Sequence, residues 1–307
     1  MSEIVIIGAA IIDVLVRPVS ASVFETGSYP AEDIRMSPGG DALNEALVLA
    51  GLGKQVQLET IVGDDMAGRF LTNECRDRGI VLRRDQVRKK IPTGINVVLV
   101  AGDGERSFLT NPGGTLRALK VTDICMPFGK EVRYLCFASI FVFPEIGEAQ
   151  LAQIFSQAKA QGITVCADMT KCKCGETISD MARAFVYIDY LFANEQEAAL
   201  LTGETDTEKA SESLLASGAG HVIIKCGARG CLVKTTSEMY RVPVEKSIEC
   251  IDTTGAGDSF VAGFIYALSE GKGLYSCAQF ANRCGAEAVG MLGGTEWTYT
   301  FNEEEKR

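Results

Sequence analysis

The stretch DTTGAGDSF, residues 252–260, leads into a helical pattern of apolar residues at Phe260, Val261, Phe264, Ile265 and Leu268. Gly255 and Gly257 allow a tight turn that exposes consecutive amide N–H groups at the start of this helix. The positive end of the helix dipole lies there as well, so the turn suits an anion. Asp258, a carboxylate beside that turn, fits a base that deprotonates a hydroxyl attacking the anion. The stretch predicts phosphoryl transfer to an alcohol, although such a motif in isolation also fits an ordinary glycine-rich helix start.

Length, composition and charge indicate a globular protein with a large core. The chain has 307 residues, of which 47 % are hydrophobic and 23 % are charged. A net charge of −10 argues against a nucleic-acid-binding protein, which needs a basic face. No segment approaches the roughly 20 apolar residues that span a bilayer, so we expect no membrane partner. The first apolar run, residues 4–12, lacks a basic leader and predicts a strand rather than a signal peptide.

Cysteine and histidine usage narrows the chemistry. The eleven cysteines are scattered through apolar stretches, which is typical of reduced, buried thiols in a chain of this size, and we expect a cytoplasmic protein. A single histidine, His221, excludes Ser-His-Asp and Cys-His catalysis and a histidine-rich metal site. Cys172 and Cys174 form a close pair, but a structural zinc site normally draws on a second pair.

Strand and helix patterns alternate along most of the chain. Strands are expected over residues 4–7, 11–16, 56–62, 132–137, 163–167, 190–193 and 222–225, and helices over 42–52, 66–78, 147–161, 195–201, 206–217 and 279–289. This alternation predicts an α/β fold with a mostly parallel central sheet and helices on both faces.

Two hairpins interrupt the alternation, over residues 93–110 and 231–242. The first, turning at Gly102-Asp103-Gly104, is expected to act as a lid that excludes water from a bound substrate. No Pro- or Ser-rich linker divides the chain. We therefore expect one α/β domain over residues 1–307, with a small β lid from about residues 11–18 and 91–111.

Polar and glycine-rich motifs follow several predicted strands, and ligands of parallel sheets bind beyond the carboxyl ends of strands. Gly39-Gly40-Asp41 and Asn44 put a flexible backbone and polar side chains at a helix start, which suits hydroxyl binding; the alternative is a loop with Asp41 as the helix cap. Asp13 lies between apolar residues, so it either occupies an exposed strand face or accepts hydroxyl hydrogen bonds.

Two later motifs could serve a nucleotide. Asn194 and Glu197, three residues apart in a first helical turn, could hold the water shell of Mg²⁺, or could simply cap the helix. In residues 225–231, KCGARGC, two glycines allow close approach of a ligand and Lys225 and Arg229 supply positive charge; the alternative is a plain β-turn.

Together, these motifs resemble the PfkB, or ribokinase-like, carbohydrate kinase family over nearly the whole chain. The residues that carry the resemblance are Gly39-Gly40 with Asn44, Thr93-Gly94, Asn194-x-x-Glu197, Lys225-x-Gly227-x-x-Gly230 and residues 252–258. The resemblance implies a ribokinase-like fold. It also implies an ATP-dependent kinase that phosphorylates a hydroxyl, expected to be a primary one, of a free sugar or sugar derivative.

The resemblance also assigns roles to individual residues. Asp258 would be the catalytic base, and the N–H groups of Gly255, Ala256, Gly257 and Asp258 would form the anion hole. Asn194 and Glu197 would organise Mg²⁺, through water, and the phosphates. The nucleotide-side residues would be Lys225, Gly227, Gly230 and Asn282. The sugar-side residues would be Asp13, Gly39, Gly40, Asp41, Asn44, Asn111 and Asp168.

Family members often bind K⁺ near the anion hole, and Asp252 and Thr254, with backbone from residues 289–295, would fit such a site. Many relatives carry Asp-x-Asn-x-Arg after a central strand, whereas residues 168–172 read DMTKC. Asp41 and Glu45 make the sugar-side loop acidic, which favours a neutral acceptor over a sugar phosphate. Positive charge that could offset this acidity is available at Arg106, Arg117 and Lys171.

Alternatives remain open at this point. A nucleoside kinase or a sugar-phosphate kinase of the same fold fits the motifs, and Phe108, Phe141 or Phe143 could stack on a base. A non-catalytic sugar-binding sensor has no need of Asp258. Gly8-Ala9-Ala10-Ile11 lacks a dinucleotide fingerprint, and no P-loop motif occurs. Val98 and Leu99 in the lid hairpin could pair two subunits in a homodimer.

Overall fold

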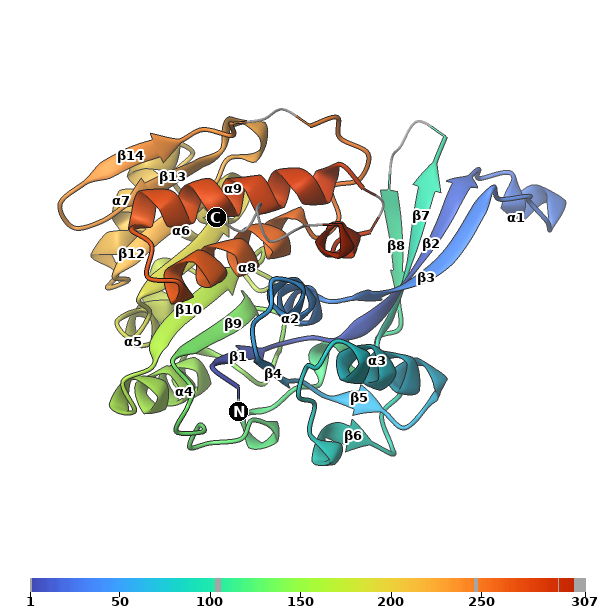
Figure 1. Cartoon of the computed structure of the whole chain (residues 1–307). Coiled ribbons are helices and arrows are strands. Elements are labelled where there is room, and N and C mark those ends of the chain that lie inside the picture. The colour runs from blue at the N-terminus through green and yellow to red at the C-terminus, as the bar shows by residue number, and fades with distance from the viewer. Residues whose placement is uncertain (1, 103–105, 246–247, 292, 301–307) are drawn as a thin grey trace.

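An eight-stranded sheet organises the protein, for which a computed structural model describes residues 2–102, 106–245, 248–291 and 293–300 (Figure 1). The sheet order is β14-β13-β12-β11-β10-β9-β1-β4. The strands are β1 (Ile4–Ile7), β4 (Val56–Glu59), β9 (Tyr134–Ile140), β10 (Thr164–Met169), β11 (Tyr190–Asn194), β12 (His221–Lys225), β13 (Cys231–Lys234) and β14 (Met239–Val242).

Strands β4, β1, β9, β10, β11 and β12, neighbours in that order, pair in parallel. Strands β13 and β14 add an antiparallel edge. The first strand reads IVII, and every one of its side chains is buried. Such unbroken apolar runs are typical of parallel strands that are covered on both faces. The structure therefore confirms the predicted α/β class with a mostly parallel sheet.

Helices cover both faces of this sheet (Figure 1). On one face lie α2 (Asp41–Gly51), α8 (Ala256–Ser269) and α9 (Leu274–Val289), and on the other α4 (Glu148–Ala160), α5 (Ala182–Phe185), α6 (Glu195–Thr202) and α7 (Thr207–Ala216). Gly263 lets α9 approach α8, because a Cβ there would lie 2.6 Å from the sulfur of Cys284. None of the described helices is long and apolar enough to cross a membrane.

The lid is a separate four-stranded sheet that projects from the main body (Figure 1). Its order is β3-β2-β7-β8, with β2 (Ile11–Val19), β3 (Asp33–Gly39), β7 (Ile95–Ala101) and β8 (Arg106–Thr110), and the short helix α1 (Val23–Thr26) joins β2 to β3. The expectation of a loop before Asp41 missed β3. This strand mixes polar residues with Ile34 and Met36 and contains Pro38, but it lies at an edge, where a proline costs no ladder hydrogen bond. The predicted hairpin turn at 102–104 falls mostly outside the described residues.

Other boundaries also differ from expectation. The closing helix begins at Leu274 rather than at Gln279, because Gly273 caps it without a side-chain signal. The run 56–62 divides into β4 and the two-residue strand β5 (Val62–Gly63), which pairs with β6 (Val87–Arg88) beside α3 (Met66–Asp77).

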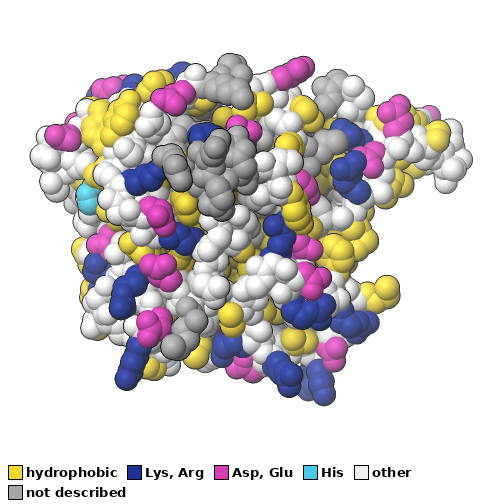
Figure 2. All heavy atoms as spheres, in the orientation of Figure 1, with side chains coloured by type: hydrophobic (Ala, Val, Ile, Leu, Met, Phe, Trp, Pro, Cys, Tyr) yellow, Lys and Arg dark blue, Asp and Glu magenta, His cyan; other side chains and the backbone are white. Residues whose placement is uncertain are grey.

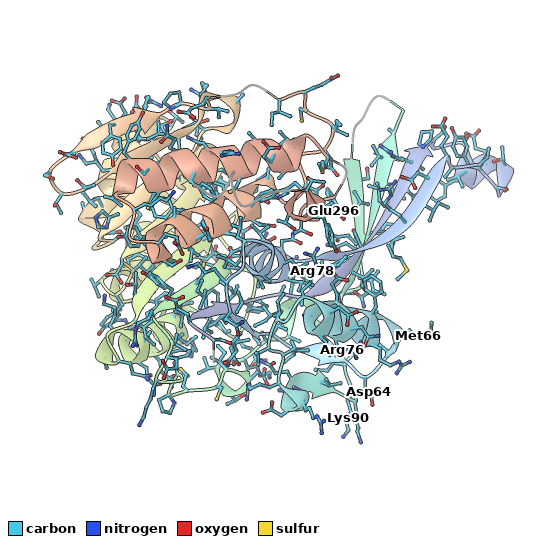
Figure 3. The ribbon with its side chains drawn as sticks, viewed as in Figure 1. Asp64, Met66, Arg76, Arg78, Lys90 and Glu296 are labelled. Atoms are coloured by element: carbon cyan, nitrogen blue, oxygen red, sulfur yellow. The ribbon has the colours of Figure 1, made fainter. Side chains whose placement is uncertain are left out.

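The base of the lid is tied to α3 through Asp65. Its carboxylate accepts hydrogen bonds from the amide of Gly68 (2.8 Å) and from the amide (2.8 Å) and hydroxyl (2.7 Å) of Thr93, where the lid hairpin begins. At the far end of α3, Arg78, which is labelled in Figure 3, stacks on the ring of Tyr299, 3.7 Å from its centroid. The lid and the C-terminal segment are thus both anchored on α3.

Helix α2 buries a carboxyl group, that of Glu45. It has no exposed surface, and among the described residues no nitrogen or oxygen donor reaches its oxygens, so that only the weakly donating thiol of Cys136 lies beside them. Burial first, and then the neighbouring charges of Asp168 and Asp258, raise the pKa of Glu45 well above its usual range. The neutral acid is therefore the favoured form in the folded protein.

We expect Glu45→Gln to flatten the pH dependence of stability. The folded-state pKa of Glu45 lies above the unfolded value, so its contribution is fully present below the unfolded pKa of roughly 4.3 and is lost as pH rises through the folded pKa. The Tm of Glu45→Gln should therefore fall less than that of the natural protein as pH rises from about 6 to 9. Thermal unfolding followed by circular dichroism measures the Tm at each pH. Exposed Glu131→Gln should behave like the natural protein, and equal slopes for all three proteins would contradict the expectation.

Candidate active site

A pocket of about 360 Å³ opens where the carboxyl ends of the central strands meet the first turns of α2, α6 and α8. Its lining consists of Asp41, Ser139, Asp168, Met169, Thr170, Asn194, Glu197, Lys225, Gly227, Gly257 and Asp258. Eight of these are residues that the sequence analysis singled out for the site, from five separate segments of the chain. The parallel sheet brings them together because its strands end at a common edge.

The start of α8 presents free backbone donors to this pocket. Gly255 caps the helix with φ 69°, and a Cβ there would lie 2.4 Å from the Cα of Gly294, so both the conformation and the space require glycine. The amide of Ala256 makes a long 3.4 Å hydrogen bond to Thr253. Within the described part of the chain, the amides of Gly257 and Asp258 donate to no protein acceptor. They remain available to an anion.

Asp258 lines the pocket beside those amides, and its carboxylate accepts a 2.7 Å hydrogen bond from the side-chain amide of Asn44. Burial, followed by the charge of Asp41, raises the pKa of Asp258 well above its usual range, while the Asn44 hydrogen bond lowers it. A raised pKa makes a carboxylate a stronger base. The contact also joins α2 to α8 and so links the expected sugar loop to the expected anion turn.

Lys225 provides a positive charge in the pocket, on a side chain that is 14 % exposed. Its ammonium group donates to both oxygens of Asp168, each at 2.8 Å, and lies 3.5 Å from where a Cβ of Gly257 would be. Burial lowers the pKa of Lys225, but the charges of Asp168 and Glu197 outweigh this and raise it, so the group stays charged. The sequence predicted that Lys225 supplies positive charge to a nucleotide. It did not predict the ion pair between Lys225 and Asp168.

Asn194 and Glu197 form the capping arrangement that the sequence left as an alternative. The amide of Glu197 donates to the Asn194 side chain (2.8 Å), and the amide of Asn194 donates to Glu197 Oε2 (2.7 Å). Burial raises the pKa of Glu197 to about 7, although Lys225 lowers it. The cap does not exclude a ligand role, because both residues also line the pocket.

The described residues contain no group of three or more His, Cys, Asp or Glu side chains placed to hold a metal ion directly. A Mg²⁺ ion keeps several of its waters and often needs only one or two protein oxygens besides substrate phosphates. The side-chain oxygens of Asn194 and Glu197 are of the kind that this donor set requires.

The lid strand β2 contributes Asp13 next to the sugar loop. Asp13 lies between Asn96 of β7 and Ser37 of β3, and one carboxylate oxygen lies 2.1 Å from where a Cβ of Gly39 would be. Burial raises the pKa of Asp13 to about 6, and the charge of Asp41 adds to this while Asn96 opposes it. Gly40, with φ 91°, would place a Cβ 2.6 Å from the Ala9 carbonyl oxygen. The two glycines therefore let the loop pack against β2 and its neighbours.

Other predicted residues lie outside the pocket lining. Asn111 closes the lid base by accepting from the Ile95 amide (2.8 Å) and donating to the Thr93 carbonyl (3.2 Å). Asn282 donates to the Val242 carbonyl (2.9 Å) and so ties α9 to β14.

The backbone around Gly230 is crowded, because a Cβ there would lie 2.0 Å from the carbonyl oxygen of Val242. Asp252 is buried and accepts from the amides of Thr254 (2.8 Å) and Gly293 (3.3 Å). Glu45, expected in the acidic sugar loop, points into the core instead.

Sequence reasoning missed Ser139, whose hydroxyl donates to Asp41. Ser139 lies near the end of the apolar strand β9, and nothing in the sequence around it signals its left-handed backbone, φ 62°. Thr170, the threonine of DMTKC at the position where many relatives carry Asn, lines the pocket as well.

Comparison with known proteins identifies the family of the chain. The family model for pfkB family carbohydrate kinases matches residues 1–298. The chain is 28 % identical over 268 residues to aminoimidazole riboside kinase of Salmonella typhimurium, covering 83 % of each protein. It is 28 % identical over 323 aligned positions to ribokinase of Bacillus subtilis, covering 100 % of this chain and 99 % of that one.

The fold is similar to that of Arabidopsis thaliana ribokinase complexed with ribose and ATP. The TM-score is 0.78 at 24 % identity, and the match covers 97 % of this chain and 96 % of that one. At this identity the likeness concerns the fold. The family match over residues 1–298 and the pocket that Gly257 and Asp258 line lead to one conclusion: this chain belongs to the PfkB family of carbohydrate kinases.

Proposed function

We propose that this protein transfers the γ-phosphoryl group of ATP to a hydroxyl, preferably a primary one, of a free sugar or sugar derivative. The observation that carries the proposal is the juxtaposition of the Asp258 carboxylate with the free amides at the start of α8, in one pocket. A base and an anion site at the same place serve a reaction in which a hydroxyl attacks a phosphate.

In this mechanism, Asp258 takes the proton from the sugar hydroxyl. The hydroxyl oxygen forms a bond to the γ-phosphorus, the bond from that phosphorus to the β–γ bridging oxygen breaks, and ADP leaves. The amides of Gly257 and Asp258, together with the ammonium of Lys225, stabilise the negative charge that gathers on the phosphoryl oxygens. Asn194 and Glu197 would hold Mg²⁺ through water. The bound ion would neutralise part of the phosphate charge.

The remaining assignments divide the site between its two ligands. We propose that the sugar lies among Asp13, Gly39, Gly40, Asp41, Asn44 and Asp168, with Asn111 shaping the lid base above it. The nucleotide would lie along Gly227 and Gly230, with Asn282 holding the neighbouring β14 in place. Asp252 and Thr254 support a K⁺ site, because both lie in the segment that leads directly into the anion turn. The free state of all eleven cysteines supports a cytoplasmic location.

The pocket favours a neutral sugar over a phosphorylated one. Its lining has acidic side chains on several elements, and its one lysine among the described residues is already paired with Asp168. A sugar phosphate would bring a dianion into this environment. No aromatic side chain of the described residues lines the pocket, so a nucleobase would find no stacking partner there. The nucleoside alternative is therefore weaker.

A coupled ADP-release screen tests the proposal across pentoses, hexoses, ketoses, sugar acids, sugar phosphates and nucleosides, with and without K⁺. We expect turnover with a free sugar and faster turnover when K⁺ replaces Na⁺. Turnover with nucleosides alone would overturn the substrate assignment, and ATP binding without turnover on any acceptor would favour the sensor alternative.

We expect Asp258→Asn to lower kcat by about 100- to 10,000-fold, because an amide cannot accept the hydroxyl proton. The KM for the sugar should change little, since the amide retains the size of the carboxyl group. Steady-state kinetics with the best sugar of the screen measures both constants. Asp206→Asn, which alters a cap on the distant helix α7, is the matched control. Turnover retained in Asp258→Asn would remove the assigned base.

We expect Lys225→Met to weaken ATP utilisation, with kcat/KM for ATP falling about tenfold or more, because charge-assisted contacts to phosphate are lost. The substitution also leaves Asp168 buried without its cation, so Tm should fall. Lys225→Met/Asp168→Asn should recover Tm but not ATP utilisation, which separates folding from function. An unchanged kcat/KM for ATP in the double variant would contradict the role.

We propose that a second copy of the chain covers the outer strands of the lid. Large apolar side chains there are exposed to solvent, at Ile34 (68 %), Met36 (55 %), Phe108 (61 %) and Leu109 (59 %). Figure 2 shows hydrophobic side chains gathered below the projecting lid. Val98, expected at such an interface, is instead buried within the lid.

Sedimentation velocity should find a dimer for the natural protein and a monomer for Met36→Glu, because a charge in an apolar interface opposes association. Phe24→Glu, at an exposed apolar residue of α1 outside the lid sheet, is the control and should leave the dimer intact. A monomeric natural protein would refute the proposal.

A further inference from the structure

The end of strand β9 has an unusual backbone. Ser139 and Phe141 have positive φ angles, 62° and 79°, and they are the non-glycine residues with such angles in the described part of the chain. Left-handed conformations are costly for residues other than glycine and persist where the surroundings impose them. The pairing of β9 with β10 also shifts register between Ala167 and Met169, so the irregularity involves both strands beside Asp168.

This irregular backbone delivers the Ser139 side chain to the pocket. Ser139 is only 4 % exposed, and its hydroxyl donates a hydrogen bond to Oδ2 of Asp41. Asp41 is the first residue of α2 and lines the same pocket. The contact therefore connects the end of a sheet strand to the helix that carries the sugar loop, and it engages one of the two carboxylate oxygens of Asp41.

The surroundings of Asp41 make such a partner necessary. Charged groups face it from its own helix and from every neighbouring element: Glu45 of α2, Asp13 of β2, Asp168 of β10, Lys173 of the loop that follows β10, Glu197 of α6, Lys225 of β12 and Asp258 of α8. Burial, followed by the charge of Asp168, raises the pKa of Asp41 to about 6. A hydroxyl donor opposes this by stabilising the ionised carboxylate without adding charge.

We propose that Ser139 is a positioning residue, whose left-handed backbone directs its hydroxyl to Asp41 and holds that carboxylate in the orientation that binds a sugar hydroxyl. The inference rests on the proposed function and specifies how the sugar side of the site is assembled. It explains why a serine, rather than the glycine that this backbone favours, occupies the position: glycine would relieve the backbone but remove the hydroxyl.

Three substitutions separate the hydroxyl from the backbone. Ser139→Gly removes both the hydroxyl and the strain, Ser139→Ala removes the hydroxyl alone, and Ser139→Asn keeps a donor on a residue that tolerates left-handed backbone. With the best sugar of the screen, we expect kcat/KM to fall roughly tenfold in the glycine and alanine variants, mainly through KM, and to recover partly in the asparagine variant. We expect Ser139→Gly to have a Tm at least equal to that of the natural protein and above that of Ser139→Ala.

A readout without substrate completes the test. Carbon-13 NMR of the carboxyl groups should show the pKa of Asp41 higher in Ser139→Gly than in the natural protein, because the lost hydrogen bond favours the ionised form. In an Asp41→Asn background, Ser139→Gly should change kcat/KM much less, since the partner is gone.

Unchanged kcat/KM and an unchanged Asp41 pKa in Ser139→Gly would overturn the inference while leaving the kinase assignment intact. A natural protein that phosphorylates no sugar would instead overturn the proposed function. A Ser139→Gly variant with a lower Tm and unchanged KM would show that Ser139 only supports the packing of β9, and would also overturn the inference.

Discussion

The electrostatic balance around Lys225 is the constraint on which the rest of the site depends. Its ammonium holds Asp168 in a two-oxygen contact and lies among the carboxylates of Glu197 and Asp258. Without such a cation, several acidic groups buried together would either take up protons or destabilise the folded pocket. Burial and the charge of Asp41 still raise the pKa of Asp258, which is the property that its proposed role as a base requires.

Close backbone approach is the second requirement. Gly255 has no room for a side chain against Gly294, and Gly40 has none against Ala9, so the anion turn and the sugar loop can both pack tightly. At Ser139 the reverse holds, because a residue with a side chain occupies a backbone conformation that favours glycine. Its hydroxyl thereby lies beside Asp41. Strain retained at a functional site in this manner is a form of preorganisation.

The lid and the central sheet contribute to the pocket in different ways. The sheet brings distant segments to one edge, as the Asn44–Asp258 contact across 214 residues shows. The lid adds Asp13 from β2, and its base is secured by Asp65 and Asn111 through contacts to residues 93–95. Under the proposed function, a polar and acidic pocket would suit a small neutral polyol, and a lid that covered it would exclude the water that competes with the sugar hydroxyl.

Local patterns in the sequence were enough to predict the α/β class, the lid hairpin, the helix start before Asp258 and, as one of two alternatives, the cap formed by Asn194 and Glu197, because each depends on residues close together in the chain. Tertiary structure alone decided the edge strand β3, the burial of Glu45, the pairing of Lys225 with Asp168 and the reach of Ser139 to Asp41. These features arise from contacts between segments far apart in the sequence, and their stability comes from burial and shared charge, which no local pattern records.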